Sequence, residues 1–118
     1  MPAQPTYKAL DLFNTSKKLV IACYELTHDL PAEEKTNLIQ YIRTAAVTVH
    51  LNIIQGSFLK KNKKKKKAIR TIQNALVIIN AAVEVLMEVG YTTEEKSSYI
   101  LHLSNNCSQL LDDLKKEK

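Results

Sequence analysis

A regular series of apolar residues in the second half of the chain restricts what this sequence can fold into. The members step by 3, 4, 3, 4, 3 and 4 positions and are Ile69, Ile72, Leu76, Ile79, Val83, Leu86 and Gly90. This spacing places them on one side of an α-helix over three heptads. Other apolar residues lie off that side, namely Val77, Ile78, Ala81 and Val85. A helix that is apolar almost all round is buried on several sides, so we expect a subunit interface as well as an internal core.

Three further segments have helical periodicity, which gives expected helices over 8–28, 31–55, 63–89 and 93–116. In the first, a stripe runs through Phe13, Ser16, Val20, Cys23 and Thr27, beside Leu12, Leu19 and Leu26. In the second, the stripe is Leu38, Ile42, Ala45, Val49, Asn52 and Gly56. Pro31 suits the first turn of that second helix, and Gly90 suits the end of the third. Thr92 and Glu95 fit a capping box at the start of the fourth.

Composition agrees with an all-α protein. The 118 residues include only 2 Gly and 3 Pro, too few turn residues for an all-β domain. Short connections between four long helices favour antiparallel neighbours, so we predict one domain over 1–118, an up-down-up-down four-helix bundle that forms a homo-oligomer. The start of the chain does not resemble a signal peptide, and the most apolar window, 75–83, is shorter than the about 20 residues of a membrane span. These features predict a cytoplasmic protein without membrane contact.

Positive charge is concentrated in one segment. Between Ser57 and Asn74 the chain carries eight cations and no acid, so the remaining chain is net −3. The cations are Lys60, Lys61, Lys63, Lys64, Lys65, Lys66, Lys67 and Arg70. One interpretation is a solvated surface; the other is a nucleic-acid-binding surface, because amide donors and ammonium groups at a helix start suit phosphate oxygens. Phe58 is the only aromatic residue nearby, so contacts to the backbone are expected rather than base stacking.

Signals for an enzyme are nearly absent. The sequence has no phosphate-binding glycine loop, nucleophile elbow or HExxH motif, and its three histidines lie in different segments. We therefore predict a protein that is not an enzyme, with no catalytic residue, no metal and no cofactor. Cys23 and Cys107 lie on apolar stripes and are expected to be free thiols in the core, too far apart along the helices for a disulfide.

Four other residues are candidates for structural or interface roles. Arg43 is expected in a salt bridge between helices or subunits, with a surface ion pair as the alternative. Asn52 falls in phase with the buried stripe, which favours a hydrogen bond that fixes the register of the bundle or, near Gly56, a ligand-facing role. Asn80 lies among apolar residues and is expected to bond across a helix or subunit interface.

Several motifs resemble the bacterial four-helix-bundle family named for proteins encoded in 23S rRNA intervening sequences, often labelled ribosomal. They are Tyr7-Lys8-x-Leu10, Tyr24-x-Leu26-Thr27, Leu30-Pro31-x-Glu33-Glu34, Ile42-Arg43-x-Ala45-Ala46-Val47-x-Val49-x-x-Asn52-Ile53-x-x-Gly56, and Gly90-Tyr91. The resemblance implies a homopentamer without known catalytic activity. It also implies kinship with the accessory variability determinant of diversity-generating retroelements, a pentameric barrel that binds nucleic acid and a reverse transcriptase through basic surfaces.

The function expected from these features is a non-enzymatic, oligomeric scaffold that binds the backbone of RNA or DNA through the lysine-rich segment. The alternative is an adaptor or accessory subunit that recruits a reverse transcriptase or another nucleic-acid enzyme. In that case the lysines serve solubility, and exposed apolar helix faces give specificity.

Overall fold

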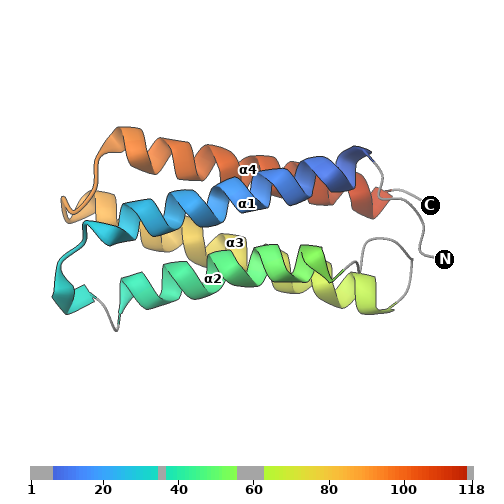
Figure 1. Ribbon diagram of the computed structural model, residues 1–118, viewed down its shortest axis with the longest axis horizontal. Helices are drawn as coiled ribbons and strands as arrows, with labels where there is room; N and C mark the ends of the chain where they lie inside the picture. Colours follow the sequence, from blue (N-terminus) through green and yellow to red (C-terminus); the bar gives the residue numbers. More distant parts are fainter. Residues whose placement is uncertain (1–6, 35–36, 56–62, 117–118) are drawn as a thin grey trace.

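Four long helices make up the computed structural model, which describes residues 7–34, 37–55 and 63–116. They are α1 (Tyr7–His28), α2 (Leu38–Ile54), α3 (Lys63–Glu88) and α4 (Glu94–Lys116), with a short 3₁₀ turn η1 (Ala32–Glu34) before α2. No strand occurs among the described residues. The helices lie along the long axis of a molecule that measures 47 × 24 × 19 Å (Figure 1). The predicted all-α, four-helix class is therefore confirmed.

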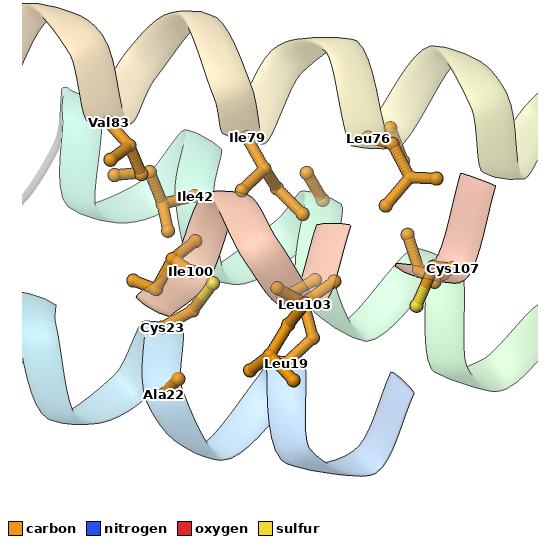
Figure 2. Close-up of a cluster of buried hydrophobic side chains, with 14 of the residues drawn as sticks. Leu19, Ala22, Cys23, Ile42, Leu76, Ile79, Val83, Ile100, Leu103 and Cys107 are labelled. Carbon is orange, nitrogen blue, oxygen red and sulfur yellow. The ribbon is translucent and has the colours of Figure 1, made fainter. Parts of the chain in front are cut away.

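Each helix packs against its neighbour in the chain, and α1 also packs against α4. This closes a four-sided arrangement around one core, to which all four helices contribute (Figure 2). The apolar series in α3 is the centre of that core, because Ile72, Ile79, Val83 and Leu86 have no exposed surface. Burying one such side chain fully stabilises the fold by about 1.5–3 kcal/mol. The heptad series therefore has the structural role that its spacing predicts.

The second helix differs from its expected extent and face. Instead of a helix from Pro31, the chain makes the 3₁₀ turn, in which the amide of Glu34 donates to the carbonyl of Pro31 at 3.0 Å, and α2 starts only at Leu38. The buried face includes Ile39 and Ile53, whereas Asn52 is only half-buried. The middle of the expected stripe, Ile42, Ala45 and Val49, is buried as predicted, and only its two ends are displaced by one residue, from Leu38 to Ile39 and from Asn52 to Ile53. Gly56 lies outside the described residues.

The turn between α3 and α4 contains a helix-ending motif. Gly90 has φ of +80°, the amide of Tyr91 donates to the carbonyl of Leu86, and the amide of Gly90 donates to that of Met87. This pair of bonds is a Schellman motif, as Gly90-Tyr91 predicts. The capping box predicted for Thr92 and Glu95 is not formed. Thr93, not Thr92, caps the helix by accepting from the amide of Lys96 at 3.1 Å, and the N3 position is then Lys96, which has no acceptor to return the bond.

One described helix has the length and composition of a membrane span. It covers Lys64–Glu88, and 44% of its most apolar window is buried within the molecule. The signal is weak, because the core helix of a bundle has the same properties. The apolar window at 75–83 is shorter than the helix that contains it. Asn80 interrupts the apolar residues there, but the helix continues to Glu88.

Replacing Gly90 tests the turn. Gly90→Ala should lower the free energy of unfolding by about 1–2 kcal/mol, because an L-residue is strained at positive φ. No atom lies within 4 Å of the added Cβ, so the cost is one of backbone conformation and not of packing. Urea denaturation measures it, with Ser98→Ala, an exposed position in α4, as the control. Equal stability of Gly90→Ala and the parent chain would contradict the assigned turn.

Candidate nucleic-acid interface

The lysine-rich segment forms the first turns of α3, where its members have different environments. Lys64, Lys66, Lys67 and Arg70 are exposed. Lys63 opens the helix. Lys60 and Lys61 lie outside the described residues. The exposed cations lie at the positive end of the helix dipole, where they gain from an anion that neutralises them.

Lys65 does not belong to the exposed set. It is only 7% exposed, and its Nζ donates to the carbonyl oxygen of Leu114 at 3.2 Å. This bond satisfies one of the last carbonyls of α4, which have no partner within their own helix. The sequence analysis included Lys65 among the lysines predicted to bind phosphate, because a run of identical residues does not indicate which one faces inward. We correct its role to that of a structural contact between α3 and α4.

The same contact reveals cations that the sequence did not assign to the site. Because Lys65 bonds to Leu114, the exposed Lys115 and Lys116 at the end of α4 lie at the same end of the molecule as the start of α3 (Figure 1). In the sequence these residues are about 50 positions from the lysine-rich segment. Only the packing of α4 on α3 brings them together. We refer to Lys64, Lys66, Lys67, Arg70, Lys115 and Lys116 as the basic end.

Apart from Asp11, Asp112 and Asp113, which lie towards the basic end, the described carboxylates gather at the opposite end. They lie at the end of α1, in η1, at the end of α3 and at the start of α4, and are Glu25, Asp29, Glu33, Glu34, Glu84, Glu88, Glu94 and Glu95. Two contacts join these elements there. Lys96 Nζ lies 3.6 Å from Asp29 Oδ2, and the Tyr91 hydroxyl lies 3.5 Å from Glu33 Oε1. The bundle is therefore electrically polarised along its length.

Arg43 joins α2 to α1 by a different interaction from the expected salt bridge. Its Nε donates to Thr27 Oγ1 at 2.7 Å, and its guanidinium carbon lies 4.5 Å from the centroid of the Tyr24 ring. The Thr27 hydroxyl in turn donates to the carbonyl of Cys23 at 2.7 Å. Between helices of the described chain, Arg43 thus forms a cation–π contact and a hydrogen bond instead of an ion pair.

The hydrogen bonds of the two candidate asparagines differ from the bonds between helices that the sequence predicts. Asn52 Nδ2 donates to the carbonyl of Thr48 at 2.8 Å, within α2 itself. The Oδ1 atom of Asn80 is shielded from solvent and accepts no hydrogen bond from the described part of the chain. The bond between helices predicted for Asn80 is therefore not made by this oxygen.

A contact that the sequence did not predict joins the middle of α1 to the last turns of α2. His50 Nδ1 lies 2.8 Å from Ser16 Oγ, and the His50 ring packs in a tilted arrangement against the Phe13 ring, with 5.2 Å between the ring centroids. Ser16 already donates its hydroxyl proton to the carbonyl of Phe13, so Nδ1 of His50 is the donor to Ser16. Burial, followed by the charge of Lys17, lowers the pKa of His50. Ser16 could be recognised from the sequence only as a polar residue on an apolar stripe.

The lowered pKa of His50 predicts a pH dependence of stability. The unfolded chain takes up a proton at His50 near its ordinary pKa of 6.5, whereas the folded chain does so only at lower pH. The contribution of His50 is therefore complete above about pH 7.5 and is lost as the pH falls through 6.5 towards the lowered value. His50→Asn should remove the contribution of His50 to the pH dependence of the free energy of unfolding. Urea denaturation between about pH 8 and pH 5, a range that brackets the ordinary pKa, measures it. If the free energy of unfolding changed with pH equally in the parent chain and in His50→Asn, the prediction would be wrong.

Neither a metal centre nor a reactive thiol stands out. Among the described residues, no three His, Cys, Asp or Glu side chains are placed to hold a metal ion. Cys23 and Cys107 are buried free thiols, and burial raises the pKa of each to about 12. A cavity of about 250 Å³ between α1 and α4 has an apolar floor at Ala22 and Ile100, and its rim includes Asp29 and Lys96. It lies at the acidic end, away from the basic end.

Geometry and sequence together define an all-α, four-helix protein with a basic end. The family described as 23S rRNA-intervening sequence protein matches residues 8–113. The chain belongs to this family, as its motifs indicated. No curated protein matches the chain closely enough to add a named relative.

The structural role of Lys65 can be separated from the role of its neighbours. Lys65→Met keeps an apolar chain of similar length but leaves the Leu114 carbonyl without this donor, so the free energy of unfolding should fall by about 1–2 kcal/mol. Lys64→Met, one residue earlier and exposed, should change it by less than about 0.5 kcal/mol. Urea denaturation of both variants measures the difference. Equal effects would contradict the inward placement of Lys65.

Proposed function

We propose that this protein is a non-enzymatic, oligomeric scaffold that binds the phosphate backbone of RNA or DNA. The observation that carries the proposal is the basic end, where exposed cations of α3 and α4 occur together. Ammonium and guanidinium groups neutralise phosphates and release counterions, whatever the base sequence. The family description, which refers to an intervening sequence of 23S rRNA, supports a connection with RNA.

The polarity of the bundle gives the binding a direction. Carboxylates at the far end repel a polyanion, whereas the basic end attracts it, so nucleic acid should approach one end only. Buried Lys65 is excluded from the contact surface. Backbone contacts of this kind orient the protein without reading sequence, so affinity should depend strongly on salt and weakly on sequence.

Two finer points of architecture belong to the same proposal. An up-down-up-down order is supported by the packing of each helix on the next and of α1 on α4. Assembly of several copies is supported by the exposed apolar residues of α3, including Val77 and Val85. The family resemblance implies five copies, which would collect five basic ends in one cytoplasmic particle.

The alternative is an adaptor that recruits a nucleic-acid enzyme such as a reverse transcriptase. The observation that favours it is the number of exposed large apolar and aromatic side chains, among them Tyr41 at 60% and Val77 at 66%. Such residues on a surface fit a protein partner better than a polyanion. In that case, removing charge from the basic end leaves the protein partner bound.

Salt-dependent binding tests the main proposal. We expect the affinity for a single-stranded RNA of random sequence to fall steeply with salt. Replacing Lys64, Lys66 and Lys67 by Gln should reduce the slope of log affinity against log salt by about 2, at roughly 0.7 per lost contact. Fluorescence anisotropy measures the slope, and circular dichroism checks the fold.

The matched control removes three exposed lysines elsewhere, Lys17, Lys18 and Lys96. It should leave most of the slope in place, because these residues lie outside the basic end. If both variants lost the same amount of the salt slope, RNA binding would depend on the total charge of the protein and not on the basic end. An absence of binding at low salt would reject the proposal and favour the adaptor.

A further inference from the structure

The cavity between α1 and α4 has no role in the function proposed above. It measures about 250 Å³, and buried side chains of α1 and α4, Ala22, Leu26 and Ile100, form its floor. Ala22 and Ile100 mark the two helices in Figure 2. The volume far exceeds the about 10–15 Å³ that one water molecule needs, but it is below the about 300–1,000 Å³ of pockets for drug-sized ligands. The cavity therefore suits a very small molecule or a single side chain.

The rim of the cavity carries more negative than positive charge. Glu25 and Asp29 of α1 and Lys96 of α4 line it, which gives two carboxylates against one ammonium group. Glu25 is exposed and forms no ion pair within the described part of the chain. The other carboxylates of this end of the molecule add to the same negative potential. An apolar floor below a negative rim favours a ligand with an apolar stem and a cationic head.

The side chain of Lys96 already makes one of the contacts that such a ligand would make. Its Nζ lies 3.6 Å from Asp29 Oδ2, and the two side chains are 55% and 68% exposed. Ion pairs between exposed side chains are weak, so an added cation can take the place of Lys96 at Asp29. Tyr99, which is 51% exposed, lines the same cavity and supplies an aromatic ring that attracts ammonium and guanidinium groups.

A hollow on the other side of α1 lacks two of these features. It shares Glu25 and Asp29 with the cavity, but its other lining residues are Tyr24, His28 and Arg43, so it has no aliphatic floor. The guanidinium carbon of Arg43 lies 4.5 Å from the centroid of the Tyr24 ring. The aromatic ring of this hollow therefore already contacts a cation of the chain itself. Only the cavity between α1 and α4 combines a floor, a rim and an accessible ring.

We propose that this cavity binds an alkylammonium or alkylguanidinium group, the chemistry shared by lysine and arginine side chains and by free aliphatic amines. The stem of the ligand contacts Ala22 and Ile100. Its cationic head lies between Glu25 and the Tyr99 ring, and Asp29 exchanges Lys96 for the ligand. The site goes beyond nucleic-acid binding, because it lies at the opposite end of the molecule from the basic end and takes a ligand of opposite charge to phosphate.

A titration with butylammonium chloride tests the site. Amide chemical shifts of isotope-labelled protein should change in a saturable way on both helices, at Ala22 and Ile100 among others. The affinity should be of roughly millimolar order, as suits a ligand of so few atoms. Butanol has the same stem without the charge, and potassium chloride has a charge without the stem. Equal shift changes with either control, or none with butylammonium, would overturn the proposal.

Two variants with opposite effects test the roles of the rim. Glu25→Gln should weaken butylammonium binding about fivefold, because it removes the carboxylate that meets the cationic head. Lys96→Met should strengthen it about threefold, because it removes the competing ammonium group and keeps an apolar stem. Glu84→Gln removes a carboxylate at the same end of the molecule but outside the cavity, and should leave binding unchanged. Equal affinities in all three variants would reject the assigned roles.

Two further probes distinguish the sources of the ligand. Binding of lysine with both its amino and carboxyl groups capped, as tightly as butylammonium, would identify the side chain of a basic protein partner. Binding of diaminobutane without binding of the capped lysine would identify a free amine. Binding of neither would overturn the proposal. These titrations contain no RNA, so their outcome is independent of whether the basic end binds nucleic acid.

Discussion

Burial of one side of α3 is the constraint on which the rest of the structure depends. Ile72, Ile79 and Val83 are fully enclosed, and they can be enclosed only if α1, α2 and α4 surround them. Those helices supply their own apolar residues to the same core (Figure 2). The order of the helices around α3 then decides which termini meet, and so where the charges of the chain gather.

Polar contacts refine this apolar core rather than create it. Lys65 reaches the last carbonyls of α4, Arg43 stacks on Tyr24, and His50 bonds to Ser16. Each contact joins two neighbouring helices through a long or polar side chain. Their positions explain why one lysine in a run of five has a structural role while its exposed neighbours can bind a ligand.

Both proposals for function and assembly use the same helix. Its first turns carry the exposed cations, its buried side forms the core, and its outward side carries exposed apolar residues, including Val77 and Val85.

The sequence by itself determined the helices and their buried sides, because a period of 3.6 residues is a local property that the heptad series of α3 and the Gly90 turn express directly. Tertiary structure decided what depends on contacts between distant segments. The inward placement of Lys65, the approach of Lys115 and Lys116 to the start of α3, and the pairing of Arg43 with Tyr24 all result from packing. A run of identical lysines shows its charge in the sequence, but which member faces a carbonyl depends on the neighbouring helix.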